Sequence, residues 1–208
     1  MGVHENRLLF KIARRRVIVS RIFAIVVILL VTFTAAPYKE GSLTDILFET
    51  FGLFLLTVCS MGRLWALLYI SGYKKLELIT EGPYSMVRHP LYVFSLIGAI
   101  GIGLASENIL VLAVMVIFYL SYYPLTIFAE EKKLVDKFGQ AYLDYIKRTP
   151  RFLPKFSLYK GSAQYQINAD IFVKNLANGM WFIWIFILLN FIETLQETGY
   201  IPVLLSVP

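Results

Sequence analysis

The sequence predicts an all-α, polytopic integral membrane protein with about five transmembrane helices and one amphipathic interfacial helix. Hydrophobic residues make up 58% of the 208-residue chain, whereas charged residues make up only 16%. A soluble protein of this size has too little interior to bury so much apolar surface. Several apolar stretches also approach the roughly 20 residues with which a helix crosses about 30 Å of hydrocarbon. Lipid is therefore the expected solvent for most of the chain.

The first two spans are predicted at residues 17–36 and 46–70. The first follows a basic segment, as in a signal peptide, but it lacks a convincing cleavage site and more spans follow, so we expect it to be retained. The second is interrupted only by Arg63, about 10 Å from the end of the span at roughly 1.5 Å per residue. We expect Arg63 to extend toward the headgroups, with a role in a functional site as the alternative.

The third and fourth spans are predicted at residues 91–105 and 109–128. The third starts directly after Pro90, whose missing N–H suits the first turn of a helix. The short link at 106–108 makes the two spans an antiparallel hairpin.

Three glycines of the third span, Gly98, Gly101 and Gly103, could be compared with a nucleotide-binding loop. No strand precedes them, and the surrounding residues are apolar. Close packing against a neighbouring helix is therefore expected.

A polar segment separates the fourth span from the fifth, which is predicted at residues 175–192. Its apolar residues recur at helical spacing and indicate an amphipathic helix at the membrane surface. Pro150 and Pro154 end that helix because neither can donate the helical N–H. The residues of its apolar face are Leu134, Val135, Phe138, Tyr142, Tyr145 and Ile146.

The positive charges predict the orientation in the membrane. Of the 20 Lys and Arg residues, 18 lie at or before the start of the first span, in the loop 71–90 or in the segment 129–174. The positive-inside rule places these segments and the N-terminus in the cytoplasm, and the C-terminus on the opposite side. The basic side chains that give the chain its net charge of +6 are then expected to contact anionic membrane lipids, so no nucleic-acid partner is expected.

Candidate chemistry gathers at one end of the hairpin. His89 and Tyr92 enter the third span, and the pair Glu130 and Glu131 leaves the fourth. The hairpin brings these ends together, so His89 and Tyr92 can face Glu130 across a cavity. The alternative is that Arg88 and the glutamates form surface ion pairs worth about 0–1 kcal/mol.

A metal site is not expected from the histidine and cysteine content. The only other histidine is His4 in the N-terminal tail, and the single cysteine, Cys59, lies in an apolar run. Neither supplies the ligand set that zinc requires beside His89.

Five motifs resemble the isoprenylcysteine carboxyl methyltransferase family in order and spacing. They are LITEGPY at 78–84, VRHPLY at 87–92, EEKKL at 130–134, FGQAY at 138–142 extended to Tyr145, and RTP at 148–150 extended to Pro154. The resemblance covers about residues 60–155, a methyltransferase-like core within a single domain of residues 1–208. Residues 156–208 then form a C-terminal extension that carries an extra span.

The resemblance implies that S-adenosylmethionine binds in a cytoplasm-facing cavity and that a lipidic acceptor enters from the bilayer. The ammonium of the cofactor suits a carboxylate such as Glu130, and aromatic faces stabilise its sulfonium. The cofactor contacts implied by position are Leu76, Glu77, Leu78, Ile79, Tyr84, His89, Pro90, Leu91, Tyr92 and Glu130.

One departure from the family pattern concerns the substrate. Prenylcysteine enzymes carry a basic residue just before the paired glutamates to hold the substrate carboxylate, whereas Thr126 stands there in this chain. Arg63, Arg148 or Arg151 could substitute, or the acceptor is another lipid amine, thiol or carboxylate. We assign catalytic roles to Glu130, Arg148 and Arg151.

Two other functions fit the same helix pattern. Sterol-type membrane reductases have similar closing helices and would use a nicotinamide cofactor. A non-catalytic membrane scaffold would bind neither cofactor.

Overall fold

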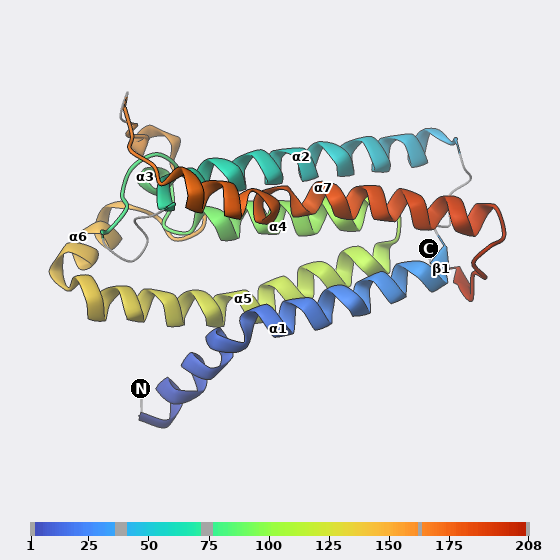
Figure 1. Ribbon diagram of the computed structural model, residues 1–208. Helices are drawn as coiled ribbons and strands as arrows, with labels where there is room; N and C mark the ends of the chain where they lie inside the picture. The colour runs from blue at the N-terminus through green and yellow to red at the C-terminus, as the bar shows by residue number, and fades with distance from the viewer. Residues whose placement is uncertain (1–2, 36–40, 72–76, 162–163, 207–208) are drawn as a thin grey trace.

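The computed structural model describes residues 3–35, 41–71, 77–161 and 164–206. Five long helices form its body: α1 (Val3–Phe33), α2 (Leu43–Ile70), α4 (Pro90–Ala105), α5 (Ile109–Phe138) and α7 (Ala169–Glu197). The short helices α3 (Pro83–Met86) and α6 (Gln140–Arg148) lie at one end, followed along the chain by the turn η1 (Phe156–Leu158). At the other end, two-residue strands β1 (Thr34–Ala35) and β2 (Leu205–Ser206) pair in parallel (Figure 1). We call these the α3–α6 end and the β1–β2 end.

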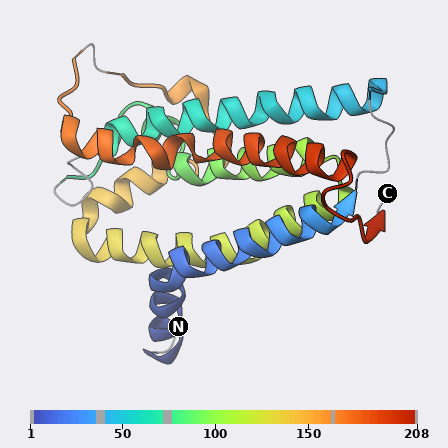
Figure 2. The same cartoon turned by 45° about the vertical axis from the view of Figure 1, so that its right-hand side comes forward.

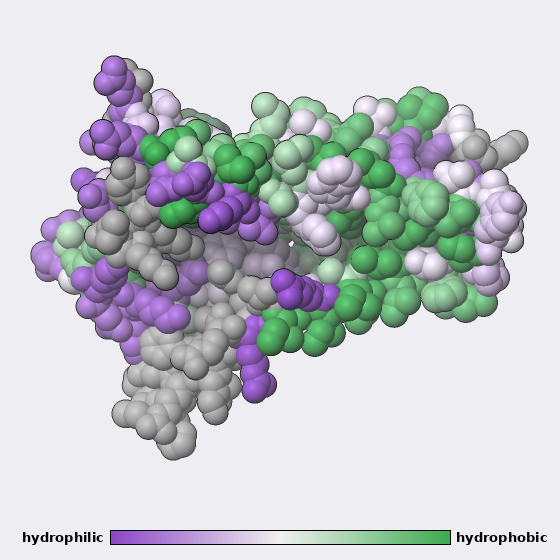
Figure 3. Space-filling model, viewed as in Figure 1, coloured by the Kyte–Doolittle hydropathy of each residue, from purple (hydrophilic) through white to green (hydrophobic). Residues whose placement is uncertain are grey.

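The predicted all-α membrane fold is confirmed. Among the described residues, α2, α5 and α7 are long and apolar enough to cross a membrane, and Ile18–Phe33 and Pro90–Ala105 are shorter apolar helices. A hydrophobic surface covers much of the bundle, and hydrophilic residues gather at the α3–α6 end (Figure 3). The predicted end of the first span, Ala36, lies outside the described residues.

The long helices form two layers. Helices α2, α4 and α7 pack together in one layer, and α1 packs along α5 in the other (Figures 1 and 2). Helices α4 and α5 are joined by the short link 106–108 and pack against each other, so the predicted hairpin is confirmed. Asn108 caps α5 by accepting hydrogen bonds from the N–H groups of Leu110 and Val111.

Glycines allow α2 and α4 to approach closely. A Cβ added at Gly52 would lie 2.6 Å from the backbone nitrogen of Ala105, and one at Gly101 would lie 3.1 Å from the carbonyl oxygen of Gly52. A Cβ at Gly98 would lie 2.6 Å from the sulfur of Cys59. The small residues of the third span therefore serve helix packing, as predicted.

The predicted interfacial helix is divided in two. Leu134 and Phe138 belong to the last turns of α5, which continues well beyond the predicted end of the fourth span. Gly139 follows with a φ of 52°, a conformation that breaks the helix and favours glycine. Helix α6 then starts in a new direction and buries Tyr142 and Tyr145. The apolar spacing of this segment gave no sign of the break.

Candidate functional site

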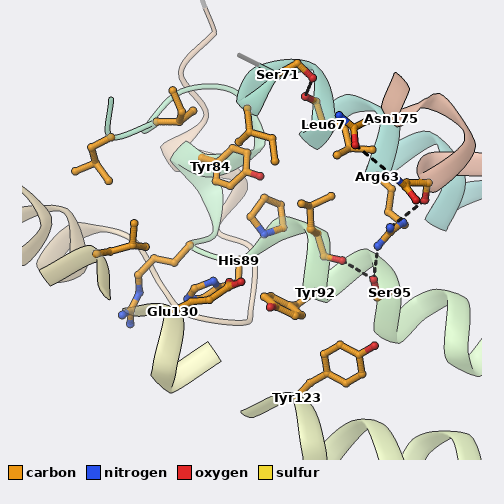
Figure 4. A pocket seen from close by; sticks show the side chains of 18 of the residues that line it. Arg63, Leu67, Ser71, Tyr84, His89, Tyr92, Ser95, Tyr123, Glu130 and Asn175 are labelled. Atoms are coloured by element: carbon orange, nitrogen blue, oxygen red, sulfur yellow. Dashed lines mark hydrogen bonds between the residues drawn. The ribbon is translucent and has the colours of Figure 1, made fainter. Parts of the chain in front are cut away.

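A cavity of about 960 Å³ opens among the helices near the α3–α6 end (Figure 4). Its volume lies at the upper end of the range of about 300–1,000 Å³ that small-molecule sites occupy. The surface is visibly hollowed between the two layers of helices (Figure 3). Nine of the ten residues that the family resemblance implies as cofactor contacts line this cavity; they are Glu77, Leu78, Ile79, Tyr84, His89, Pro90, Leu91, Tyr92 and Glu130. The tenth, Leu76, lies outside the described residues.

The turn that carries Tyr84 and His89 is built by glycine and proline. Gly82 adopts a φ of 58° before α3, and Pro83 and Pro90 occupy the first turns of α3 and α4. Proline suits these positions because its fixed φ matches the helix and its missing N–H leaves no donor unpaired. The sequence thereby sets the local path of the cavity wall.

The segment after α6 fastens that turn. The N–H of Arg88 donates to the carbonyl of Pro150 at 2.8 Å, and the N–H of Lys155 donates to the carbonyl of Met86 at 3.0 Å. The N–H of Gly82 donates to the carbonyl of Lys160 at 2.7 Å. Residues 82–88 are thus held by backbone hydrogen bonds to residues 150–160.

A cluster of charged side chains centres on Glu131, which is only 7% exposed. Arg88 Nη1 lies 2.8 Å and His89 Nε2 lies 3.0 Å from Glu131 Oε1. Arg151 completes the cluster with two bonds, from Nη2 to Oε2 at 2.6 Å and from Nε to Oε1 at 3.1 Å. Such two-pronged pairing between guanidinium and carboxylate is strong and directional. The cluster therefore joins the α3–α4 turn, α5 and the segment after α6.

His89 lines the cavity with Tyr92 and Glu130, as the hairpin predicts, and its ring also has a hydrogen-bond partner. The hydrogen bond of its ring goes to Glu131, whereas Glu130 lines the cavity. Neighbouring residues on a helix point about 100° apart at roughly 3.6 residues per turn, so the two carboxylates face different surroundings. The hairpin brought the right segments together, but motif spacing did not show which glutamate His89 would contact.

Tyrosines form much of the wall between His89 and the opposite side of the cavity (Figure 4). The hydroxyl of Tyr145 donates to the carbonyl of Tyr84 at 2.7 Å, and the hydroxyl of Tyr119 donates to the carbonyl of Tyr92. The rings of His89 and Tyr92 meet edge to face, with centroids 5.9 Å apart. Burial raises the pKa of the Tyr84 phenol well above its usual range, so this hydroxyl stays neutral.

The three arginines proposed to hold a substrate carboxylate differ in position. Arg148 is exposed on α6 and does not line the cavity. Arg151 is committed to Glu131, and its guanidinium lies 4.7 Å from the centroid of the Phe128 ring. Arg63 lines the cavity. Thr126 is fully buried and is absent from the cavity wall, so the position of the family's basic residue does not face this space.

Arg63 is hydrogen-bonded to two neighbouring helices. Its Nη1 donates to the hydroxyl of Ser95 on α4 at 2.6 Å, and its Nη2 donates to the carbonyl of Asn178 on α7 at 3.0 Å. These partners hold the guanidinium inside the bundle, across the cavity from Glu130 (Figure 4). The alternative of a role in the site is thus the one that the geometry favours.

Sequence reasoning missed the parts of the wall that come from α1 and α7, because both helices lie outside the motif region. The one available signal was the polar pair Asn175 and Asn178, three residues apart at the start of an apolar run. The missed lining residues on these two helices are Ser20, Arg21, Ala24, Ile171, Asn175, Asn178 and Trp181.

A second group of ionisable residues lies at the β1–β2 end. Carboxylate oxygens of Asp45, Glu107 and Glu193 lie within 4.8 Å of one another, an arrangement that could hold a cation. The histidine and cysteine content, from which no metal site was expected, does not bear on this group of carboxylates. The three carboxylates come from separate parts of the chain, so their spacing in the sequence gave no signal.

Comparison with known proteins places this geometry in a class. The model of the phospholipid methyltransferase family matches residues 51–141, a range that includes most of α2, all of α3 to α5 and the turn with Tyr84 and His89. Together with the helical membrane fold, this match supports the class of membrane methyltransferases. No solved structure matches the chain.

Relatives along nearly the whole chain are bacterial proteins. The nickel-cobalt-cadmium resistance protein NccN of Alcaligenes xylosoxydans xylosoxydans is 34% identical over 95% of this chain and 92% of its own. The cobalt-zinc-cadmium resistance protein CzcN of Cupriavidus metallidurans is 33% identical over 90% of this chain and 86% of its own. The protein-S-isoprenylcysteine O-methyltransferase of Schizosaccharomyces pombe is 34% identical over 37% of this chain and 33% of its own. The chain belongs to the same family as NccN and CzcN, and its residues 51–141 match the model of the phospholipid methyltransferase family.

Proposed function

We propose that the protein transfers a methyl group from S-adenosylmethionine to a lipidic acceptor within the membrane. The observation that carries this proposal is the cavity itself. It gathers nine residues that the family resemblance implies as cofactor contacts, although they lie in three separate segments of the chain. The volume of about 960 Å³ lies within the range of about 300–1,000 Å³ that small-molecule sites occupy.

The residues of the wall fit the chemical groups of this cofactor. The carboxylate of Glu130 suits an ammonium, the rings of Tyr84 and Tyr92 suit a sulfonium, and the apolar side chains of Leu78 and Ile79 suit an adenine. When bound, S-adenosylmethionine supplies an electrophilic methyl group. The wall residues orient the reactants and exclude water, which are the main contributions to an in-line transfer that needs no covalent intermediate.

Calorimetry of the detergent-purified protein with S-adenosylhomocysteine tests the proposal. The wild type should bind, and Glu130→Ala and His89→Ala should each weaken binding by about tenfold or more, equivalent to about 1.4 kcal/mol. Asp144→Asn changes a carboxyl group that is exposed on α6 and should bind like the wild type. Binding of NADPH in place of S-adenosylhomocysteine would favour the reductase alternative. If neither molecule binds, the scaffold alternative is favoured.

We propose further that the α3–α6 end is cytoplasmic and the β1–β2 end lies on the opposite side. The distribution of basic residues supports this orientation. Lys147→Cys and Thr44→Cys place thiols at exposed positions at the two ends. The native Cys59 is fully buried and should not react. In inside-out vesicles, a membrane-impermeant maleimide should label Lys147→Cys and spare Thr44→Cys; the reverse pattern would overturn the orientation.

A second, compatible proposal concerns the role of the methylation. The similarity to NccN and CzcN supports a contribution to tolerance of divalent transition metals. Expression in a metal-sensitive bacterium should raise the tolerated concentration of cobalt or cadmium. If tolerance depends on methyl transfer, Glu130→Ala should lose the gain, whereas Asp144→Asn should keep it. Equal tolerance with and without the protein would contradict the proposal.

A further inference from the structure

The cavity extends beyond the segment that the motifs describe. Its wall continues through Ser20 on α1, Tyr123 on α5 and Asn175 on α7, which the family resemblance does not assign to the cofactor. The hydroxyl groups of Ser20 and Tyr123 lie 3.3 Å apart and link α1 to α5. This polar extension lies between the two layers of helices, outside the part of the wall that the family resemblance assigns to the cofactor.

Arg63 provides the strongest feature of this extension. It lies seven residues before the end of α2 at Ile70, about 10 Å along the helix at roughly 1.5 Å per residue. Its guanidinium is fixed by Ser95 and the carbonyl of Asn178, and it lies 5.4 Å from the centroid of the Phe182 ring. Three helices therefore hold one cation at a defined point of the wall.

The charge of Arg63 is not balanced by an acidic side chain. Within the described part of the chain, its hydrogen bonds go to a hydroxyl and a carbonyl, and its buried Nε has no hydrogen-bond partner. A cation at this depth of an apolar bundle is costly unless an anion accompanies it. An anionic group of a ligand in the cavity would balance this charge.

The other described arginines near the cavity either form ion pairs with Glu131 or lie at the edge of the cavity or outside it. Arg88 and Arg151 both pair with Glu131, and Arg148 is exposed outside the wall. Arg21 lines the cavity but is exposed at the edge formed by α1. Among the described residues, Arg63 is therefore the fixed interior cation on the wall whose charge no acidic side chain balances.

We propose that Arg63 binds the oxyanion, a carboxylate or phosphate, of the methyl acceptor. The acceptor is then an amphiphile with a negatively charged head, held on the opposite side of the cavity from Glu130. This inference rests on the proposed methyltransferase function and names its substrate class. It moves the anion-binding role from the position of Thr126 on α5 to α2.

The cofactor also has a carboxylate, so the experiment must separate the two ligands. Calorimetry with S-adenosylhomocysteine first compares the wild type with Arg63→Gln. Glutamine can still donate to Ser95 or Asn178, so we expect the cofactor analogue to bind with similar affinity. If Arg63→Gln folds, as judged by its melting temperature, but loses this affinity, Arg63 serves the cofactor and the inference is overturned. If the wild type does not bind the analogue, it is the proposed function that fails.

The second part of the experiment measures the binding of an acceptor-like probe through the fluorescence of Trp181. Trp181 lines the cavity, and replacing Trp65 and Trp184 with phenylalanine leaves it as the single tryptophan. Bromostearate and its neutral amide are titrated into the protein saturated with S-adenosylhomocysteine, and the quenching of Trp181 is recorded. The ionised acid should bind at least about tenfold more tightly than the amide.

The variants decide whether Arg63 causes that preference. Arg63→Gln should abolish it, Arg63→Lys should retain part of it because the charge remains, and the exposed control Lys147→Gln should leave it unchanged. Equal binding of acid and amide by the wild type, or an unchanged preference in Arg63→Gln, would overturn the inference. Should Arg63→Gln fail to fold, the wild-type comparison and Arg63→Lys still decide it.

Discussion

Glu130 and Glu131 are adjacent in the chain but lie in different surroundings. Glu131 accepts hydrogen bonds from Arg88, His89 and Arg151, whereas Glu130 lines the cavity. One carboxylate therefore holds the α3–α4 turn in place, and its neighbour faces the space where a ligand would bind.

Because the two carboxylates lie in different surroundings, matched substitutions should affect different quantities: Glu131→Gln mainly the stability of the fold, and Glu130→Gln mainly the affinity for the ligand. Glu131→Gln leaves two guanidinium groups without their carboxylate and should lower the free energy of unfolding by about 3 kcal/mol. Glu130→Gln should lower the free energy of unfolding less than Glu131→Gln does, and it should weaken binding of S-adenosylhomocysteine. Thermal unfolding in detergent and calorimetry measure the two effects. Equal losses of stability in both variants would show that the two carboxylates do not have separate roles.

Close packing between α2 and α4 predicts a stability effect far from the cavity. In Gly52→Ala, the new methyl group would lie 2.6 Å from the backbone nitrogen of Ala105, so one helix must move. We expect a loss of about 1–3 kcal/mol in the free energy of unfolding. Thr57→Ala, an exposed change on the same helix, serves as the control. A melting temperature of Gly52→Ala equal to that of the wild type would contradict the packing.

The sequence predicted the helices well for physical reasons, and the family resemblance named nine of the residues that line the cavity. Long apolar runs leave few options in lipid, and a short link forces a hairpin, so Tyr92 and Glu130 had to lie at the same end. The hydrogen-bond partners of Arg63 were harder to predict, because Ser95 and Asn178 lie 32 and 115 residues away in the sequence. Spacing along one helix carries no information about such distant partners.

The break between α5 and α6 predicts a backbone effect at Gly139. Its φ of 52° is unfavourable for residues with a Cβ, while no atom lies within 4 Å of the position that the Cβ would occupy. Gly139→Ala should therefore cost about 1–2 kcal/mol through the backbone alone. Gln140→Ala, at the adjacent exposed position, is the control. Thermal unfolding of both variants measures the difference, and an unaffected Gly139→Ala would show that α6 can start in another conformation.

The carboxylates at the β1–β2 end predict a pH dependence of stability. Burial, a hydrogen bond with Asp45 and the charges of Asp45, Glu193 and Glu49 raise the pKa of Glu107 from 4.5 to about 8. Between these values the folded protein keeps a proton that the unfolded chain has released, so the free energy of unfolding falls as the pH rises. Glu107→Gln keeps the hydrogen-bonding side chain without the charge and should flatten this fall. Asp136→Asn removes an exposed carboxyl group at the other end and should retain it. Melting temperatures from about pH 5 to pH 8 test the prediction, and a wild-type stability that rises across this range would contradict it.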